Sequence, residues 1–394
     1  MSNDSYIPFH LPSIGPEEMD AVQRVLQSKW LTTGPVTLDF EREFAEYVGA
    51  KYALAVNSGT SALQLALDAF GLKAGDEVLV PTCTFTATGE VVTYFGAKPV
   101  LCDSIPGGFG VDPDDVRRKI TEKTRALIPV HMAGEVCRMD ELRAIADQQG
   151  LHIVEDAAHA LPSTYRGKKV GTISELTAFS FYATKTLATG EGGMLTTNNE
   201  DYIKRISRMR LHGIGGDAWK RYTATGSWYY EVHDAGYKMN LCDILSALGR
   251  AQLRKCDQFW EARCRIQARY DHAFGQMEEL ELPPREEGSQ HAWHLYILRV
   301  RPDQLEVNRN QFIEELKKLG IGTSVHFIPL HLHPYYQKSY GYAAGDFPNA
   351  ENSYQRCISL PIYPDLTDGQ VDRIVSAVSR VLCQNRKGQA VGRK

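Results

Sequence analysis

Short apolar segments alternate with helix-forming segments through the first half of the chain, and this alternation is the strongest constraint on the fold. Helices are expected between the strands, at Ser61–Phe70, Ala87–Phe95 and Asp140–Gln149. Such alternation is typical of right-handed βαβ units, so we predict a mainly parallel sheet of seven strands. The last strand follows its neighbour through a Gly-rich turn and is expected to run antiparallel. The predicted strands are Ala53–Val56, Glu77–Pro81, Lys98–Asp103, Arg125–Val130, His152–Asp156, Thr177–Phe181 and Met194–Thr197.

The pattern changes after Asn198, which indicates a second unit. A chain of 394 residues exceeds one ordinary hydrophobic core, so a large and a small domain are expected. We predict that residues 1–240 hold an N-terminal segment and the large α/β domain. Residues 241–394 are expected to form a connector helix and a smaller α+β domain. The elements predicted there are a long helix Leu241–Met277, strands His294–Val300 and Thr323–Phe327, and helices Asn310–Leu319 and Asp368–Cys383.

The composition is that of an ordinary globular protein, with 43% hydrophobic and 23% charged residues. The net charge of -4 gives no basic field for nucleic acid or for an anionic membrane. No apolar run approaches the ~20 residues that a membrane span needs, and Met1–Pro12 is unlike a signal peptide. We therefore expect a cytoplasmic protein with neither nucleic acid nor membrane as a partner.

Two features resemble metal-binding patterns without completing one. The eight cysteines include no Cys-x-x-Cys pair and are expected to be free thiols. His331 and His333 form a close pair, but no third ligand has a matching spacing. We predict no metal, and we interpret this segment as a loop in which His333 contacts a substrate.

One aspartate and one lysine have positions that suggest chemistry. Asp156 ends a buried strand, so its carboxylate lies at the carboxyl edge of the sheet, where open α/β sheets bind ligands. Lys185 follows the strand Thr177–Phe181, and residues 184 and 186–188 include no carboxylate. Pyridoxal phosphate (PLP) needs both groups, an amine for its aldehyde and a carboxylate for its ring nitrogen. The alternative for Asp156 is a cap of the turn that follows it.

A small, hydroxyl-rich turn, Asn57–Ser61, joins the strand Ala53–Val56 to the helix Ser61–Phe70. Backbone N–H groups and the helix dipole converge at a helix N-terminus, which makes such a turn an anion site. Ser and Thr are also ordinary N-cap residues, so a plain cap is the alternative. Beside Lys185 and Asp156, the phosphate of a cofactor is the favoured anion.

Four motifs, in order along the chain, resemble the DegT/DnrJ/EryC1/StrS family. They are Asn-Ser-Gly-Thr-Ser-Ala-Leu from Asn57, Glu-Asp-Ala-Ala-His from Glu155, Phe-Ser-Phe-x-x-x-Lys with Gly-Glu-Gly-Gly from Phe179, and Gly236–Asn240. The resemblance runs from about Pro8 to Val381, nearly the whole chain. It implies a fold type I, PLP-dependent sugar aminotransferase.

The resemblance implies a role around the cofactor ring for each of four residues. Lys185 would attach the cofactor covalently, and Asp156 would face its pyridine nitrogen. His159 would pack near the phenolic side of the ring, and Phe85 would stack on its face.

The resemblance also implies which residues contact the cofactor's phosphate and the substrate. Gly59, Thr60 and Ser180 would hold the phosphate. Asn240 would reach into the site from the partner subunit of a homodimer with shared active sites, and His326 matches a position near the sugar.

Two loops gain a second interpretation from the resemblance. The loop Thr32–Pro35 is either a plain turn or a contact with the substrate, and we include Thr32 among the substrate-binding residues. The loop Gly213–His233 could cover the neighbouring subunit's site or simply pack at an interface; its aromatic residues are Trp219, Trp228, Tyr229 and Tyr230.

The predicted function is transfer of an amino group from L-glutamate to a nucleotide-linked keto sugar. His159 stands where many members of the family carry glutamine, which favours C4 of a UDP-4-keto sugar. Three alternatives stay open: another keto acceptor such as a cyclitol, a PLP-dependent sugar dehydratase, and a PLP-binding regulator without enzymatic activity. Dehydratases of this family have histidine in place of the lysine, so Lys185 argues against that reaction.

Overall fold

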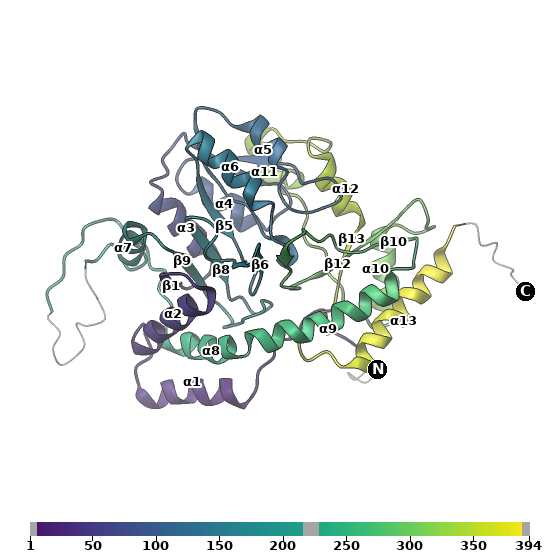
Figure 1. The fold of residues 1–394 in the computed structure, drawn as a ribbon, viewed down its shortest axis with the longest axis horizontal. Helices are drawn as coiled ribbons and strands as arrows, with labels where there is room; N and C mark the ends of the chain where they lie inside the picture. Colours follow the sequence, from purple (N-terminus) through teal and green to yellow (C-terminus); the bar gives the residue numbers. More distant parts are fainter. Residues whose placement is uncertain (1–5, 216–227, 388–394) are drawn as a thin grey trace, which may run out of the picture.

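The computed structural model describes residues 6–215 and 228–387, and its central element is a seven-stranded sheet (Figure 1). Among the described strands of this sheet, only β9 runs antiparallel to its neighbours, as the Gly-rich turn predicts. The prediction of a mostly parallel sheet is confirmed. In order across the sheet, the strands are β1 (Tyr52–Val56), β9 (Gly193–Thr197), β8 (Leu176–Ser180), β5 (His152–Asp156), β4 (Thr124–Leu127), β2 (Glu77–Pro81) and β3 (Lys98–Cys102).

Helices cover both faces of the sheet, because successive residues of each strand point to opposite faces and both sets are apolar. In β1, Leu54 and Val56 face one hydrophobic core, whereas Ala53 and Ala55 face the other. The first core is covered by α3 (Gly59–Ala69), α4 (Thr86–Thr93) and α7 (Glu200–Met209). The second is covered by α2 (Pro35–Val48), α5 (Pro113–Lys119) and α6 (Met139–Gln149).

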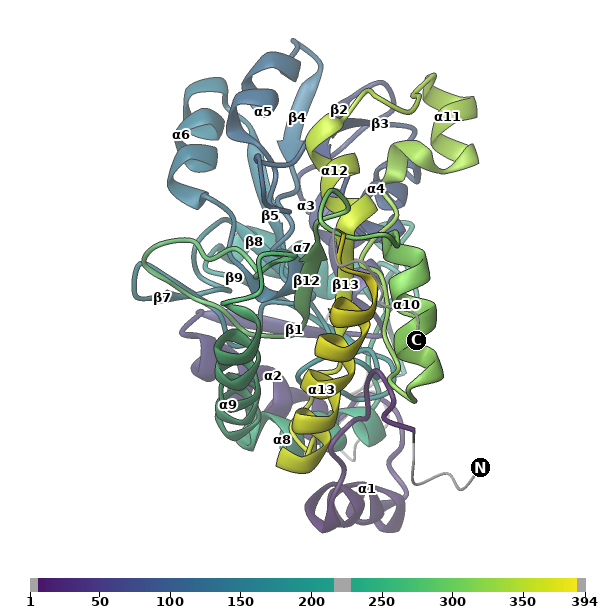
Figure 2. The same ribbon diagram turned by 90° about the vertical axis from the view of Figure 1, so that its right-hand side faces the viewer.

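A second, antiparallel sheet lies in the C-terminal part of the chain. It consists of β10 (Leu280–Glu281), β12 (Tyr296–Val300) and β13 (Cys357–Leu360). Figure 2 shows α9 (Cys256–Phe274), α13 (Asp368–Asn385) and α10 (Arg309–Lys318) side by side across this sheet, and their apolar faces share its core. This part also holds the helices α11 (Pro334–Tyr340) and α12 (Pro348–Arg356). Its strand β11 (Ser289–Gln290) pairs with β6 (Thr164–Tyr165), which pairs with β7 (Lys168–Lys169), two short strands from the segment after β5.

The prediction of one long helix from Leu241 to Met277 is wrong. The segment forms two helices, α8 (Asp243–Arg254) and α9, which run nearly end to end in Figure 1. Lys255 between them has φ -101 and ψ -2, and its Nζ lies 2.9 Å from the buried carboxylate of Glu18. The break lets α8 pack against α1 (Pro16–Ser28) and α2 while α9 packs against α13. Among the described residues, no helix combines the length and the apolar character needed to cross a bilayer.

The predicted strand Thr323–Phe327 is also wrong. Ser324 makes only an isolated bridge, with Ser359. The third strand of the sheet that contains β10 and β12 is β13, which the sequence analysis did not identify. Residues Ser324, His326 and Phe327 instead line a cavity, so their side chains face an open space rather than a paired strand. The predicted boundary between the domains at residues 240 and 241 stays a prediction.

The N-terminal segment pairs with the C-terminal part before α1 begins. The N–H of Ile7 donates to the carbonyl of Gly320 at 2.8 Å, and the N–H of Gly322 donates to the carbonyl of Ile7 at 2.8 Å. This pairing places Phe9 and His10 beside the large sheet, where both side chains line the same cavity.

Candidate active site

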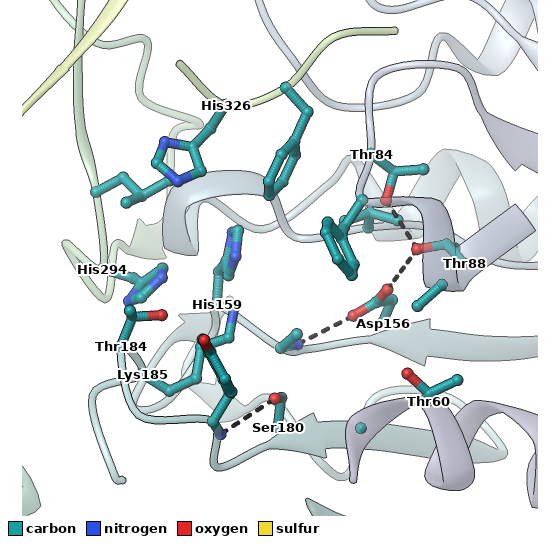
Figure 3. A pocket seen from close by; sticks show the side chains of 18 of the residues that line it. Thr60, Thr84, Thr88, Asp156, His159, Ser180, Thr184, Lys185, His294 and His326 are labelled. Carbon is teal, nitrogen blue, oxygen red and sulfur yellow. Dashed lines mark hydrogen bonds between the residues drawn. The ribbon is translucent and has the colours of Figure 1, made fainter. Parts of the chain in front are cut away.

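The carboxyl ends of four strands surround a cavity of about 610 Å³ (Figure 3). Its walls come from the segments that follow β1 and β2 and from the ends of β5 and β8. This is the edge at which open α/β sheets bind ligands. The predicted site residues that line it are Gly59, Thr60, Phe85, Asp156, His159, Ser180, Lys185 and His326.

Three predicted site residues lie outside this cavity. Thr32 is exposed in the loop before α2, and His333 is the N-cap residue of α11. Asn240 forms an isolated bridge with Val56, and its Nδ2 donates to Thr33 Oγ1 at 2.6 Å. The roles assigned to Thr32, His333 and Asn240, including a reach into the partner subunit, stay predictions.

The aromatic loop is described only in part. Trp219 lies outside the described residues. Trp228, Tyr229 and Tyr230 are 85%, 61% and 50% exposed, so their surfaces are open in the single chain. Their predicted place over a neighbouring subunit stays a prediction.

His331, considered above as half of a metal pair, has hydrogen bonds that hold two parts of the fold together. The ring is fully buried, with Nδ1 2.7 Å from Thr82 Oγ1 and Nε2 2.9 Å from Glu351 Oε1. In the described part of the chain, no cluster of three His, Cys, Asp or Glu side chains has the arrangement of a metal site.

Lys185 projects into the cavity from a tight turn that follows β8. The turn is closed by hydrogen bonds from Lys185 N–H to the Tyr182 carbonyl at 2.8 Å and from Thr189 N–H to the Phe181 carbonyl at 2.9 Å. Burial lowers the pKa of Lys185 to about 8, and the charge of Asp156 acts in the opposite direction. A lysine with a pKa near neutrality has a usable neutral fraction, which a nucleophilic amine requires.

Asp156 is 6% exposed, and both of its carboxylate oxygens have hydrogen-bond donors. Thr88 Oγ1 donates to Oδ2 at 2.8 Å, and the N–H of Ala158 donates to Oδ1 at 3.1 Å. The second bond is the turn cap considered as the alternative, so Asp156 caps the turn and faces the cavity at once. Burial raises the pKa of Asp156, and a cationic ligand group beside it would favour its charged form.

The turn between β1 and α3 forms a cradle with little side-chain bulk. Ser58 is the N-cap of α3, and its Oγ accepts from the N–H of Ser61 at 3.0 Å. The N–H groups of Gly59 and Thr60, in the first turn of the helix, have no intrahelical acceptor and are available to an anion. A Cβ on Gly59 would lie 2.9 Å from Ser180 Cβ, so glycine is required where these two segments meet.

The hydrogen-bond partner of His159 fixes the tautomer of this ring. The N–H of Ala133 donates to His159 Nδ1 at 3.2 Å, so Nδ1 is an acceptor and the ring proton lies on Nε2. Burial, with the charges of Lys185 and His326, lowers the pKa of His159 well below its ordinary value. His159 is therefore a neutral ring whose Nε2–H can donate to an acceptor in the cavity.

The cavity has further polar side chains that the sequence analysis missed, among them Thr84, Thr88, His10 and His294. Thr84 and Thr88 lie 2.8 Å apart, and together they extend the hydrogen bonding of Asp156 (Figure 3). His10 and His294 line the cavity from the N-terminal segment and from the residue pair before β12. The spacing of Thr84 and Thr88, four residues apart at the start of a helix, is the sequence signal that could have identified that pair. His10 and His294 have no such signal, because only the fold brings them to the site.

Comparison with known proteins identifies the family of this chain. A profile of the DegT/DnrJ/EryC1/StrS aminotransferase family matches residues 12–379. The chain belongs to this family. It is 50% identical over 386 residues to the protein MJ1066 of Methanocaldococcus jannaschii, covering 98% of this chain and 100% of that protein. It is 48% identical over 378 residues to the spore coat polysaccharide biosynthesis protein SpsC of Bacillus subtilis, covering 96% and 97%.

A solved structure shows the same fold with the cofactor. The PLP form of the putative sugar aminotransferase Spr1654 from Streptococcus pneumoniae has a TM-score of 0.90 at 36% identity, covering 96% of this chain and 99% of that chain. Its PMP form has the same TM-score. The predictions of the family, of fold type I, of a sugar aminotransferase and of PLP are therefore confirmed.

The residues around the cavity fit PLP. Lys185 would provide the amine, the buried Asp156 would offer a carboxylate to the ring nitrogen, and the amides at the start of α3 would hold the phosphate. Phe85 provides an aromatic face, 58% exposed in the single chain, that would be covered by a flat ring. When bound, PLP supplies the electron sink that makes removal of a proton from an amino acid's α-carbon possible.

Proposed function

We propose that this enzyme transfers the amino group of L-glutamate to C4 of a UDP-linked 4-keto sugar. The observation that carries the proposal is the convergence of Lys185, Asp156 and His159 on a single cavity of about 610 Å³. Membership of a sugar aminotransferase family supplies the reaction class, namely an amino donor and a keto-sugar acceptor.

The choice of C4 and of a UDP carrier rests on His159. This position carries glutamine in many members of the family, and the histidine resembles the members that act at C4 of UDP-linked sugars. The structure gives the ring a buried place at the cavity wall, a fixed tautomer and one free N–H. These features support a role for His159 in the site and agree with the proposed choice.

Lys185 is the residue that moves the proton. Its Nζ, with a pKa lowered to about 8, can accept a proton from the α-carbon of the donor and release it again. Asp156 holds a negative charge at the end of β5, and Thr88 and Ala158 orient its carboxylate. The half-reaction with the keto sugar uses the same residues in reverse order.

The proposal includes a homodimer with shared active sites and a cytoplasmic location. Asn240, which lies outside its own chain's cavity, would complete the site of the partner. The exposed Trp228, with its two neighbouring tyrosines, would be covered in such an assembly. Size-exclusion chromatography with light scattering tests the dimer directly.

The presence of Lys185 argues against a sugar dehydratase, because dehydratases of this family have histidine at the lysine position. An aminotransferase with a different keto acceptor keeps every residue of the cofactor site and differs only in the outer part of the cavity. The acceptor must therefore be identified by experiment.

The first test follows the visible spectrum of the purified enzyme before and after L-glutamate is added. Loss of the yellow colour with formation of 2-oxoglutarate would support the donor half of the proposal. The resulting amino form would then be mixed with UDP-4-keto sugars, and recovery of the yellow form with an amino-sugar product is expected. An enzyme that reacts with glutamate but with no UDP-4-keto sugar would refute the proposed acceptor.

A further inference from the structure

Two histidines that line the cavity have ring nitrogens without hydrogen-bond partners among the described residues. These atoms, Nε2 of His10 and Nδ1 of His294, are buried within the protein. A buried polar atom that makes no hydrogen bond is unfavourable, and one on the wall of a cavity can gain its missing partner from a bound ligand. The two atoms therefore indicate a ligand that is bound in this part of the cavity.

The two rings belong to the same end of the cavity. His294 lies beside Thr184 and Lys185 in Figure 3, and its ring centroid is 4.4 Å from that of His159. His10 is close enough to the turn that carries Lys185 for the Ala183 carbonyl to affect its pKa. A ligand that contacts both histidines would therefore extend from the reacting amine of Lys185.

A buried guanidinium lies behind the two histidines. Arg263 is 1% exposed, and its Nη1 donates to the carbonyls of His294 at 3.2 Å and Ile362 at 2.6 Å. In the described part of the chain, no carboxylate forms an ion pair with Arg263, and its Nε has no hydrogen-bond partner. An uncompensated buried cation is costly, and a nearby anion would offset that cost.

The charges around the histidines are positive. Burial, followed by the charge of Arg263, lowers the pKa of His10 to about 4, and the charge of Lys185 acts in the same direction. Burial, with His159, Lys185 and Arg263, lowers the pKa of His294 well below its ordinary value. Both rings are thus neutral and lie in a positive field. A neutral ring that carries its one proton on the unpartnered nitrogen can donate to a ligand oxygen, and the positive field suits a carboxylate better than an uncharged hydroxyl.

We propose that His10 and His294, with Arg263 behind them, form a subsite for a carboxylate of the amino donor. This inference rests on the proposed function, since it assumes that the donor is a dicarboxylic amino acid that reacts at Lys185. His326 lies on the same cavity but already has a partner, because its Nδ1 is 2.8 Å from Ser359 Oγ. We therefore leave His326 out of the carboxylate subsite, in keeping with its predicted position near the sugar.

The test measures binding of glutarate, which has both carboxylates of glutamate but no amine, to the holoenzyme by calorimetry. Glutarate should bind to the wild type, whereas the uncharged glutaramide should not. His10→Asn and His294→Asn should each weaken glutarate binding about tenfold, the loss expected for a hydrogen bond to a charged group. His152→Asn alters a histidine at the start of β5, outside the cavity, and is the control; it should leave glutarate binding within about twofold.

The rates of the two half-reactions, measured separately, provide a kinetic test of the subsite. The concentration of glutamate that half-saturates loss of the yellow form should rise in His10→Asn, while reaction of the amino form with the keto sugar should be much less affected. Circular dichroism and the cofactor content of each variant confirm folding, and His10→Gln repeats the test with a side chain of different length.

Two results would overturn the subsite: equal binding of glutarate by the wild type and both histidine variants, or equal binding of glutarate and glutaramide. A different result would refute the proposed function and leave the subsite in place. An enzyme that binds glutarate through His10 but aminates no UDP-4-keto sugar keeps the subsite and loses only the proposed acceptor.

Discussion

Thr88 Oγ1 donates a hydrogen bond of 2.8 Å to Asp156 Oδ2, from the first helix after β2 to the last residue of β5. Thr84 Oγ1 lies 2.8 Å from Thr88 Oγ1, so the two hydroxyls form a chain that ends on the carboxylate. Burial raises the pKa of Asp156, and the hydrogen bond from Thr88 lowers it. Thr88 is therefore a positioning residue that supports the charged form of Asp156 without lying at the reacting atoms.

Replacing Thr88 should weaken the cofactor site through Asp156. Thr88→Val keeps the shape of the side chain and removes the hydroxyl, so Asp156 loses one of its two donors. A lost hydrogen bond to a charged group is expected to cost about 1.5–3 kcal/mol, and PLP should bind about tenfold or more weakly. Titration of the apoprotein with PLP, followed by absorbance, measures this effect.

Thr86→Val provides the matched control for this variant. Thr86 is exposed on the same helix, and its Oγ1 donates to the neighbouring Glu90 at 3.4 Å. This variant should bind PLP like the wild type. Equal affinity in the Thr88 and Thr86 variants would show that Thr88 does not support the carboxylate.

Removing the charge of Asp156 should affect the reaction more than the fold. Asp156→Asn is nearly isosteric and retains an acceptor oxygen for Thr88, but it cannot stabilise a protonated ring nitrogen. The rate of the glutamate half-reaction should fall by orders of magnitude, while thermal unfolding should change little. Stopped-flow absorbance measures the rate, and an unchanged half-reaction would remove Asp156 from its assigned role.

The sequence predicted the large sheet closely because its strands are apolar on both faces and bounded by turn residues. The strands His152–Asp156 and Glu77–Pro81 have the same bounds in the structure. The break at Lys255 was not predicted, because residues on both sides of it favour a helix and only packing against α1 and α2 separates α8 from α9. The segment Thr323–Phe327 has the composition of a strand, but its side chains line the cavity.

The site likewise combines residues that the local sequence pattern predicts with residues that only the tertiary fold brings together. Lys185, Asp156 and the turn at Gly59 follow strands in the sequence, so the edge of the sheet predicts that they meet. His10 is 284 residues from His294, and the pairing of Ile7 with the segment around Ile321 is what brings it to the cavity. No local pattern could indicate that contact, and the carboxylate subsite therefore required the structure.

Gly193 should be required for the shape of the phosphate cradle. A Cβ at this position would lie 2.6 Å from the carbonyl carbon and oxygen of Ser58 and 2.8 Å from the amide nitrogen of Gly59. Gly193→Ala should therefore push the cradle away from β9, lower the free energy of unfolding by about 1–3 kcal/mol and weaken PLP binding. Denaturant unfolding and PLP titration measure the two effects.

Gly369 provides the control for this substitution. It lies in α13, where a Cβ added to it would meet no neighbouring atom within 4 Å, and its backbone conformation accepts any residue. Gly369→Ala should leave PLP binding unchanged and raise helix stability by up to about 1 kcal/mol. If both variants bind PLP like the wild type, the close approach of β9 to Ser58 does not shape the site.

The attachment of PLP to the apoprotein should become faster as pH rises through about 8. Burial lowers the pKa of Lys185 to about 8, and only the neutral amine, present above that pKa, attacks the aldehyde. The neutral fraction rises from about a tenth at pH 7 to about nine tenths at pH 9, so the rate should increase about tenfold. Stopped-flow absorbance over this range measures the midpoint, and Lys185→Ala, which has no amine at this position, should show no attachment that borohydride can trap.

The effect of Asp156 on Lys185 can be tested with the same measurement of the pH midpoint. The charge of Asp156 raises the pKa of Lys185 against the effect of burial, so Asp156→Asn should move the midpoint of attachment to a lower pH. A midpoint near 10.5, the ordinary value for lysine, would contradict the buried environment of Lys185. An unchanged midpoint in Asp156→Asn would show that the two side chains do not interact through their charges.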